Sequence, residues 1–354
     1  ASASAAVSSS IAAAAAAVYR IPALQLLLVQ KRTEDLAPQI VIAQSGHRGR
    51  VRPVERAHGC VSVPFNMPLS DVLAKLCEFN VLAAPVMRLK GQRYKYYGWI
   101  DVLDCVQAIV ELYPKCQSWD VFRGAFPTDK RWEQMTVRSF FESHRRQNAE
   151  NQFLSVPKGY SLYTAVEQLA RAGCHRVAVL DEKKNIESII TQSMVIQYVY
   201  ANLSMLDSLA EHTIADLWPE AHHRVATVSK SAFAIEAFRL MHAKNVSAVG
   251  VIDPKSKALV DVLSARDIRG LGGKFQHFEV LWATCEKFKA RAAALFPECT
   301  PRSLITVKPS ENMTAVIRKL AEHRIHRVFI VNEENHPIGV ISHGDVLRKL
   351  LFDE

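Results

Sequence analysis

The sequence predicts an α/β (α+β) fold of four repeated β-α-β-β-α units arranged as two pairs, and three observations support this prediction. Four short segments resemble one another, and each is apolar and rich in strand-forming residues. Each follows a stretch with helical periodicity. Each also precedes a polar turn, a second apolar segment and a second helical stretch. The four similar segments are 80–86, 173–179, 245–251 and 324–330.

The helix before each strand is predicted to be amphipathic. In the fourth unit Met313, Val316 and Leu320 fall on one helical face. A serine opens each helical stretch, and its hydroxyl can accept a hydrogen bond from an unpaired N–H group at the helix start. The expected helices cover 70–79, 161–172, 231–244 and 310–323.

The second strands follow turn-like polar segments, as 186–190 and 338–341 show most clearly. Longer segments separate unit one from unit two and unit three from unit four, and the second of them has helical periodicity. We therefore place the four units at 54–115, 151–205, 206–271 and 301–354, with helical connectors at 116–150 and 272–300.

Residues 1–53 are expected to form a low-complexity leader. Ten of the first 17 residues are alanine, and the first 33 contain no Asp or Glu. This composition is typical of a disordered leader with no role, and also of an organelle-targeting segment. Both interpretations stay open. If the leader is not a targeting segment, we expect the protein in the cytoplasm, the nucleus or both.

Composition excludes several classes of function. The formal charge is +9, but acidic and basic residues are interleaved, so we expect neither a nucleic-acid nor a membrane partner. No apolar stretch reaches the ~18 residues that span a bilayer. The seven cysteines lack the spacing of a zinc site, and no P-loop, nucleophile elbow or HExxH motif occurs. The chain is therefore expected to hold no metal and to be no enzyme.

The junction between the second strand and the second helix carries a repeated polar pattern. Ser264 and Ser342 are each followed three residues later by an aspartate, Asp267 and Asp345, and Asp104 holds the same place in unit one. Such a pair forms an ordinary helix cap. Alternatively, the carboxylate accepts hydrogen bonds from both hydroxyls of a ribose.

A second pattern lies at the start of the first strand. His175-Arg176 and His326-Arg327 hold the same place in units two and four, where imidazole and guanidinium groups can bind phosphate. The alternative is a core histidine beside a solvent-exposed arginine. Their distance to the later position is nearly constant, since His175 precedes Met194 by 19 residues and His326 precedes Asp345 by 19. This recurrence favours a shared ligand site.

With these motifs the chain resembles proteins with four cystathionine-β-synthase (CBS) domains, in particular the γ subunits of AMP-activated protein kinase. The resemblance covers about residues 58 to 352 and rests on 80–85 with 98–100, on 246–249, and on 325–328 with 339–345. It implies a flat disc of two CBS pairs with adenine nucleotides (AMP, ADP, ATP) at its centre. It also implies a kinase catalytic α subunit and a scaffold β subunit as partners.

The resemblance further assigns roles residue by residue. Ribose is expected at Asp104, Asp267 and Asp345. Phosphates and the adjoining turns are expected at His175, Arg176, His326, Arg327, Ser247, Ser264, Ser342 and Thr191.

Several positions depart from the family pattern, among them Gln192 and Ser193 in place of a basic pair, whereas the lack of an aspartate in unit two is shared with the family. Leu82 replaces a phosphate-binding arginine, Asp101 a threonine and Asn245 a basic residue, while Met194 stands where the other units have aspartate. These departures support an alternative function, namely a structural four-CBS scaffold with degenerate nucleotide sites.

Overall fold

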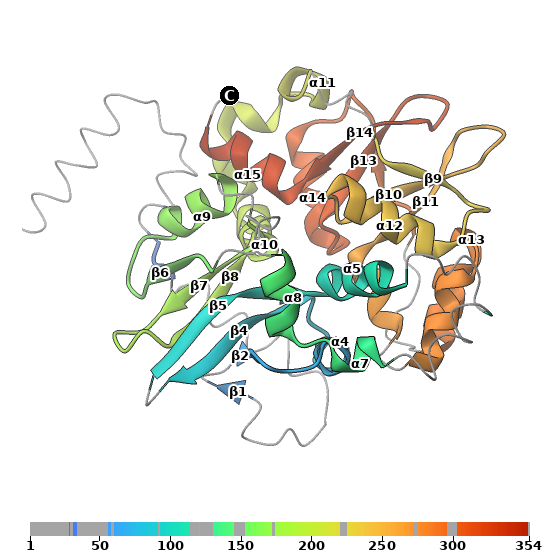
Figure 1. Ribbon diagram of the computed structural model, residues 1–354. Helices are drawn as coiled ribbons and strands as arrows, with labels where there is room; N and C mark the ends of the chain where they lie inside the picture. Colours follow the sequence, from blue (N-terminus) through green and yellow to red (C-terminus); the bar gives the residue numbers. More distant parts are fainter. Residues whose placement is uncertain are drawn as a thin grey trace, which may run out of the picture.

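The computed structural model shows four three-stranded sheets, each flanked by helices (Figure 1). In each sheet the middle strand pairs in parallel with the first strand and antiparallel with the third. This arrangement confirms the predicted fold of four units. The structure describes residues 28, 31–33, 56–57, 60–90, 93–113, 120, 130–144, 153–171, 174–219, 225–271, 275–295 and 303–352.

The first two units contain the predicted elements in the predicted order. A small sheet of β1 (Arg56–Ala57) and β2 (Cys60–Val61) precedes them, and α7 (Arg131–Gln134) and α8 (Val137–His144) lie in the connector. Unit one has β3 (Val63–Pro64), α4 (Leu69–Glu78), β4 (Ala83–Lys90), β5 (Arg93–Asp101) and α5 (Val102–Leu112). Unit two has β6 (Ser155–Pro157), α9 (Leu162–Arg171), β7 (Arg176–Leu180), β8 (Ile186–Thr191) and α10 (Gln192–Ala201).

The last two units follow after η4 (Leu203–Met205), η5 (Asp207–Ala210) and α11 (Ile214–Leu217). Between them, η7 (Phe275–Trp282) and α13 (Cys285–Leu295) form the expected helical connector. Unit three has β9 (Thr227–Ser229), α12 (Ala234–Lys244), β10 (Ala248–Ile252), β11 (Leu259–Ser264) and η6 (Ala265–Leu271). Unit four has β12 (Thr306–Val307), α14 (Met313–Glu322), β13 (Arg327–Val331), β14 (Pro337–Ser342) and α15 (His343–Leu351).

Two local predictions were wrong. The last helix of unit three is a 3₁₀ helix, η6, and the glycine-rich sequence at 270–273 disfavours its continuation as an α-helix. The serine caps also fail in three of the four first helices, because these helices begin after Pro68, Phe233 and Asn312. Only Ser161 accepts the expected hydrogen bond, from the Thr164 N–H at 3.4 Å.

The repeated segments begin before the strands do, and their first residue has a specific backbone role. Asn80, Asn245 and Arg324 have φ of 54°, 51° and 49°, just after the end of α4, α12 and α14. This left-handed conformation ends a helix by turning the chain away from the helical path, and asparagine adopts it more readily than most residues. Three of the four repeated segments therefore start with a helix stop.

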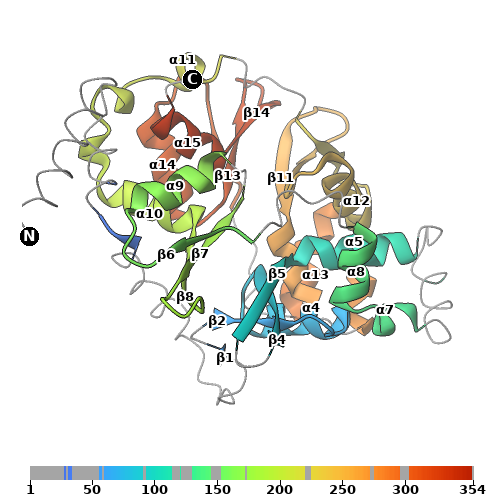
Figure 2. The same cartoon turned by 60° about the vertical axis from the view of Figure 1, so that its left-hand side comes forward.

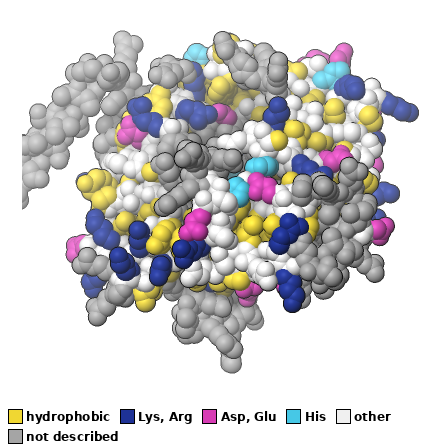
Figure 3. Space-filling view, in the orientation of Figure 1, with side chains coloured by type: hydrophobic (Ala, Val, Ile, Leu, Met, Phe, Trp, Pro, Cys, Tyr) yellow, Lys and Arg dark blue, Asp and Glu magenta, His cyan; other side chains and the backbone are white. Residues whose placement is uncertain are grey.

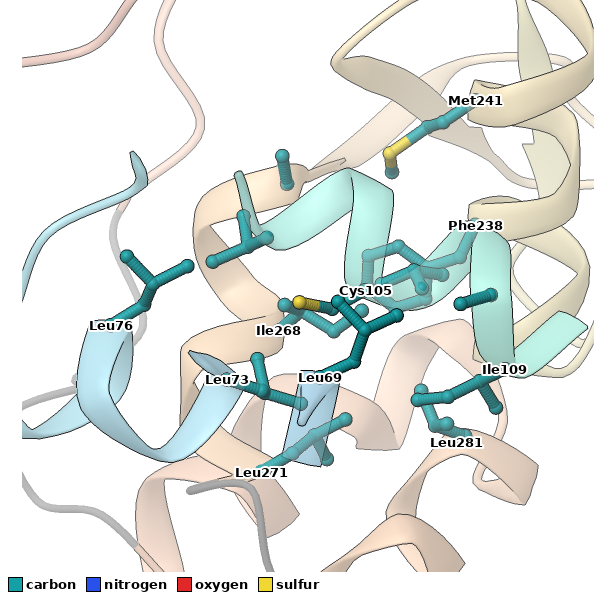
Figure 4. Packing of buried hydrophobic residues seen from close by; sticks show 14 of the residues in the cluster. Leu69, Leu73, Leu76, Cys105, Ile109, Phe238, Met241, Ile268, Leu271 and Leu281 are labelled. Atoms are coloured by element: carbon teal, nitrogen blue, oxygen red, sulfur yellow. The ribbon is translucent and has the colours of Figure 1, made fainter. Parts of the chain in front are cut away.

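The helices join units that are not neighbours in the sequence. Apolar residues of α4 and α5 in unit one share one core with those of α12 and η6 in unit three and η7 between units three and four, as Figure 4 shows for Leu69, Cys105, Phe238, Ile268 and Leu281. The helices of units two and four share a second core in the same way. Figure 2 shows these two halves side by side.

The sheets provide the other contact between units. Trp99 of unit one packs with Ala178 and Ile186 of unit two, and Leu259 of unit three packs with Phe329 of unit four. Each unit thus contacts one neighbour through its sheet and another through its helices. All four units can therefore present side chains to one common region.

Four described positions within the expected leader lie against unit two. The Lys31 carbonyl accepts a hydrogen bond from the Leu162 N–H at 2.7 Å. Leu28 is buried in the core that units two and four share. The Thr33 N–H donates to the Tyr160 carbonyl at 3.0 Å, and Arg32 forms an antiparallel bridge with Ser161. The rest of residues 1–53 lies outside the described residues. The leader is therefore anchored to the fold at its described positions.

Candidate functional site

The repeated serine and aspartate pairs form helix caps in this structure. Asp345 Oδ2 accepts hydrogen bonds from the Ser342 N–H at 2.7 Å and the Ser342 hydroxyl at 2.6 Å. Asp267 Oδ2 accepts the same two bonds from Ser264, at 2.7 and 2.9 Å. Because the caps use Oδ2 alone, they are compatible with a ligand at Oδ1.

The caps of the first two units differ from these. Asp101 replaces the serine in unit one, and its Oδ1 accepts from the Leu103 and Asp104 N–H groups at 2.8 and 3.0 Å. Asp104 Oδ2 accepts from the Asp101 N–H at 2.8 Å. In unit two the Thr191 hydroxyl accepts from the Met194 N–H at 3.3 Å, and the methionine provides no carboxylate.

A backbone hydrogen bond explains the recurring spacing. In each unit the N–H of the first residue of the second helix donates to the carbonyl of the residue just before the first full strand. We call this acceptor the pre-strand residue. The four pairs are Val102 to Leu82, Gln192 to His175, Ala265 to Ser247 and His343 to His326, at 2.9–3.2 Å. The fold itself therefore fixes the spacing, which by itself does not indicate a ligand.

The side chains at these hydrogen-bonded positions, and at the positions next to them, form a cluster. The rings of His326 and His343 lie 5.3 Å apart between centroids, and His343 Nδ1 lies 3.4 Å from the Ser193 hydroxyl. Arg327 Nη2 donates to the Ser247 hydroxyl, which links units four and three. We define the basic cluster as His175, His326, His343, Arg266 and Arg327.

Electrostatic interactions join the members of the basic cluster. Positive charge on His343, Arg327, Arg266 or His175 disfavours the protonation of His326. Arg176 and Arg327 disfavour the protonation of His175 in the same way, whereas the carboxylate of Asp101 favours it. Residues from all four units thus interact at one place, and His175, His326 and Arg327 are among them.

The three imidazoles are held neutral. The protein around His175 and His326 weakens their hydration, although both rings keep solvent-exposed surface, and this effect lowers the pKa of each. Burial lowers the pKa of His343 to about 3, although a hydrogen bond with the Ile325 carbonyl acts to raise this pKa. Burial also lowers the pKa of Arg327 to about 10, so this guanidinium stays charged at neutral pH.

Arg176 lies toward unit one. Its guanidinium carbon is 5.4 Å from the centre of the Trp99 ring, and Asp101 and Asp104 favour its charged form. The aspartate predicted to bind ribose in unit one therefore faces an arginine of the protein itself. Leu82 provides no cation at the pre-strand position of this unit.

The predicted residues accordingly fall into three groups. His175, His326, Arg327 and Ser247 meet in or beside the basic cluster, and the charge of Asp345 reaches Arg327. Arg176 interacts with Asp101 and Asp104 instead. The remaining four, Ser264, Ser342, Thr191 and Asp267, act within their own helix caps.

Sequence reasoning missed two members of the cluster. Arg266 Nη1 donates to the Arg324 carbonyl at 3.2 Å and lies close enough to affect His326. His343 is only 4% exposed. Both lie between the cap residue and the aspartate, at positions that the repeat alignment already placed beside the candidate site.

One surface feature also departs from the expected interleaving of charge. In the β4–β5 hairpin Arg88 pairs across the strands with Lys95, and Lys90 with Arg93, and no acidic residue occurs between 79 and 100. Figure 3 shows basic side chains gathered at the lower left, where Figure 1 places the ends of β4 and β5. Like charges directly opposite one another destabilise a sheet.

Within the ranges given above, no group of three or more His, Cys, Asp or Glu side chains is arranged to hold a metal ion. In the same ranges no helix has the length and apolarity needed to cross a membrane.

Comparison with known proteins identifies the repeated unit. The family model of the CBS domain matches residues 150–201, 214–272 and 299–352. This chain is a CBS-domain protein. The first unit lies outside these matches, and its sheet and helices repeat the arrangement of the other three CBS units.

The relatives of this CBS-domain protein are distant. Subunit gamma-3 of the 5′-AMP-activated protein kinase of Homo sapiens is 24% identical over 278 residues, which are 77% of this chain and 53% of that protein. Protein SDS23 of Yarrowia lipolytica is 28% identical over 195 residues, 52% of this chain and 38% of that protein. The chain thus spans about half the length of the human relative.

A solved structure has the same four-CBS architecture. Protein MJ1225 from Methanocaldococcus jannaschii superposes with a TM-score of 0.61 at 16% identity, covering 90% of this chain and 99% of that one. This likeness supports the fold. The CBS-domain protein described here is thus distantly related to the γ subunits of AMP-activated protein kinase and has four CBS units.

Proposed function

We propose that this chain is a non-catalytic regulatory subunit of a heterotrimeric protein kinase of the AMP-activated type, and that it senses AMP, ADP and ATP. Its partners are then a catalytic α subunit and a scaffold β subunit, in the cytoplasm, the nucleus or both. The observation that carries the proposal is the convergence of His175, His326 and Arg327, from two CBS units, at one place.

The chemistry of the basic cluster suits a phosphate group. The Arg327 guanidinium is charged and can donate two parallel hydrogen bonds, and the exposed rings of His175 and His326 can add further donors. The helices α10 and α15 both begin beside the cluster, since Ser193 and His343 are in contact there. Their N-terminal dipoles add positive potential.

The ribose would then bind at a carboxylate beside the cluster. At Asp345, Oδ1 is shared with Arg348, so a ribose has to compete with that exposed ion pair. At Asp267, Oδ1 has no hydrogen-bond partner within the part of the chain that the structure describes. Both carboxylates can accept from the two hydroxyls of a ribose without breaking the cap at Oδ2.

The kinase part of the proposal is supported by relatedness to the γ subunits. Nucleotide binding can change the activity of a partner kinase only if the ligands differ in affinity for its two states. The experiment must therefore measure binding first and assembly second.

A specific observation favours a second function, a structural CBS scaffold with degenerate nucleotide sites. In unit one, Asp101 and Asp104 face Arg176, and Leu82 replaces a basic residue. This unit therefore lacks a free anion site of the kind that unit four has. The scaffold function requires that the basic cluster also bind no nucleotide.

Calorimetry distinguishes the two functions. The full chain is titrated with AMP, ADP and ATP, beside Asp345→Asn and the matched control Asp216→Asn. Asp216 forms the same type of capping box in α11 with Thr213, outside the basic cluster. Loss of the Asp345 charge should weaken binding about tenfold to a hundredfold, as expected for a lost charge-assisted hydrogen bond of ~1.5–3 kcal/mol.

The outcomes separate clearly. Binding that Asp345→Asn weakens and Asp216→Asn preserves supports nucleotide sensing, and co-purification of the wild-type chain with α and β kinase subunits then supports the kinase role. A folded chain that binds none of the three nucleotides leaves the scaffold function as the better explanation.

A further inference from the structure

His343 is a buried polar side chain without a complete set of partners. It is the first residue of α15 and is 4% exposed. Its Nε2 makes no hydrogen bond within the residues that the structure describes, while its Nδ1 lies 3.4 Å from the Ser193 hydroxyl and the Ile325 carbonyl also interacts with the ring. A buried polar atom without a partner costs about 1–3 kcal/mol, so its retention requires a reason.

The equivalent position in unit two provides a comparison within the same molecule. Gln192 is the first residue of α10 and is 6% exposed. Its Nε2 donates to the carbonyls of Leu169 and Cys174 at 3.2 and 3.1 Å, and its Oε1 lies 3.3 Å from His175 Nδ1. Glutamine thus supports the pre-strand histidine of unit two with complete hydrogen bonding and no titratable group.

In unit four a histidine takes this supporting place behind His326. The rings of His326 and His343 lie 5.3 Å apart between centroids. His326 has solvent-exposed surface and can meet a ligand, whereas His343 lies behind it. The two rings form a pair that can hold one proton, because protonation of either ring raises the cost of protonating the other.

Charged groups around the pair are mainly positive. His343, Arg327, Arg266 and His175 disfavour protonation of His326, and Arg327 and His175 disfavour protonation of His343. Carboxylates contribute through Asp345, which acts on Arg327, and Asp101, which acts on His175. On α10, which packs against the start of α15, the facing groups are the uncharged Ser193 and Gln192. The charged and titratable groups that act on the pair directly are His175, Arg266 and Arg327, whereas Arg176 and Asp101 act on His175 and Asp345 acts on Arg327.

This environment leaves the pair unprotonated at neutral pH in the free protein. A phosphate group brings one or two negative charges to the exposed ring, and an opposite charge within about 4–6 Å favours the protonated imidazole. The phosphate thus supplies the negative charge that the cluster lacks. The proton comes from the solvent and is released again when the ligand leaves.

We propose that His343 is a positioning residue of the phosphate site, and that the His326–His343 pair takes up a proton when a phosphate-bearing ligand binds. The inference rests on the proposed nucleotide site and adds its regulation. Affinity for the ligand then rises as the pH falls, by up to about tenfold per pH unit if one proton is taken up. A nucleotide sensor with this pair responds to acidification as well as to nucleotide concentration.

The test measures how many protons the protein takes up when the ligand binds. The full chain is titrated with AMP at pH 7.5 in two buffers with different ionisation enthalpies, and the dissociation constant is measured from pH 7 to 8.5. Within this range AMP itself stays mainly a dianion, because the second phosphate pKa is about 6. The wild-type chain should take up close to one proton and bind more tightly at pH 7 than at pH 8.5.

His343→Gln introduces the residue that the chain itself uses at the equivalent place in unit two. It removes one of the two rings that can hold the proton and leaves His326, which burial keeps neutral, as the remaining ring of the pair, so it should reduce proton uptake and flatten the pH dependence. A control, His212→Gln, changes an exposed histidine outside the cluster and should leave proton uptake unchanged. Equal proton uptake in wild type and His343→Gln would overturn the inference, while AMP binding itself would still support the nucleotide site.

A second probe, inorganic pyrophosphate, separates failure of this inference from failure of the proposed function. If AMP does not bind, the proposed function fails. Pyrophosphate binding with proton uptake that His343→Gln reduces would then still support the phosphate site and its proton linkage. If pyrophosphate does not bind either, both proposals fail.

Discussion

Arg327 of unit four donates a hydrogen bond to the Ser247 hydroxyl of unit three. Ser247 is the pre-strand residue of β10 and Arg327 is the first residue of β13, so the bond links the starts of corresponding strands in two CBS units. The bond satisfies a charged group that burial would otherwise destabilise, as the lowered pKa of Arg327 indicates. Before any ligand is bound, this serine thus holds the guanidinium in the basic cluster.

Ser247→Ala should therefore destabilise the protein. Hydrogen bonds to charged groups contribute about 1.5–3 kcal/mol, and we expect a loss of that order in the free energy of unfolding, measured by urea denaturation. The control is Ser231→Ala, which removes an exposed hydroxyl paired with Ser229 at 2.8 Å. If the two variants lose equal stability, Arg327 does not depend on Ser247.

Stability should fall in mild acid because of His343. An unfolded histidine has a pKa near 6.5, whereas burial lowers that of His343 to about 3. Below pH 6.5 the unfolded chain thus binds a proton that the folded chain does not, and the free energy of unfolding decreases by at most ~1.4 kcal/mol per pH unit for this group. Urea unfolding from pH 7.5 to 5 measures the slope.

His343→Gln should reduce that slope, and His212→Gln should not. An identical slope in wild type and His343→Gln would show that the ring is protonated in the folded protein or that it does not contribute to the acid response.

Phe238→Ala should destabilise the half formed by units one and three. Phe238 is completely buried in their shared core, with its ring centroid 5.6 Å from that of Phe288. Truncation of a buried phenylalanine costs about 3–5 kcal/mol. Phe233→Ala is the control, because Phe233 is 39% exposed just before the same helix. Denaturant unfolding of both variants compares the two losses, and a comparable loss would contradict the shared core.

Lys95→Glu should stabilise the β4–β5 hairpin. The change replaces a pair of like charges, Arg88 and Lys95, by opposite charges at a cross-strand position. We expect a gain of a few tenths of a kcal/mol, since such pairs contribute roughly 0.2–1 kcal/mol and the site is exposed.

The reverse effect is expected for Lys158→Glu, which breaks an ion pair with Glu187 at 2.7 Å. Thermal unfolding of both variants at low salt compares them. A loss of stability in Lys95→Glu would mean that the basic hairpin does not suffer from its like charges.

The repeat, its element order and most strand positions could be predicted from the sequence. Each unit carries its own periodicity and its own helix stop, so local patterns were sufficient for them. Helix starts were predicted less well, because α4 begins after Pro68 without a side-chain cap and α14 begins after Asn312, whose side chain accepts from the Ala315 N–H. The spacing between pre-strand residue and helix start was noticed, but its cause, a backbone hydrogen bond, required the structure.

The composition of the site could be predicted only in part. His175, His326 and Arg327 were found because they recur, whereas His343 and Arg266 occur once each and gave no repeat signal. Which units share helices also could not be predicted, because an amphipathic face shows that a helix needs a partner without showing which one. Burial of His343 follows from that long-range packing.

The sharing of cores between alternate units has a consequence for synthesis. When the ribosome has completed α5, the apolar faces of α4 and α5 still lack α12 and η6, which follow only after the whole of unit two. At ~5–20 residues per second this delay is on the order of ten seconds. During that time the nascent chain exposes an apolar surface that can aggregate. A chaperone that covers this surface is therefore expected to determine the yield of native protein in the cell.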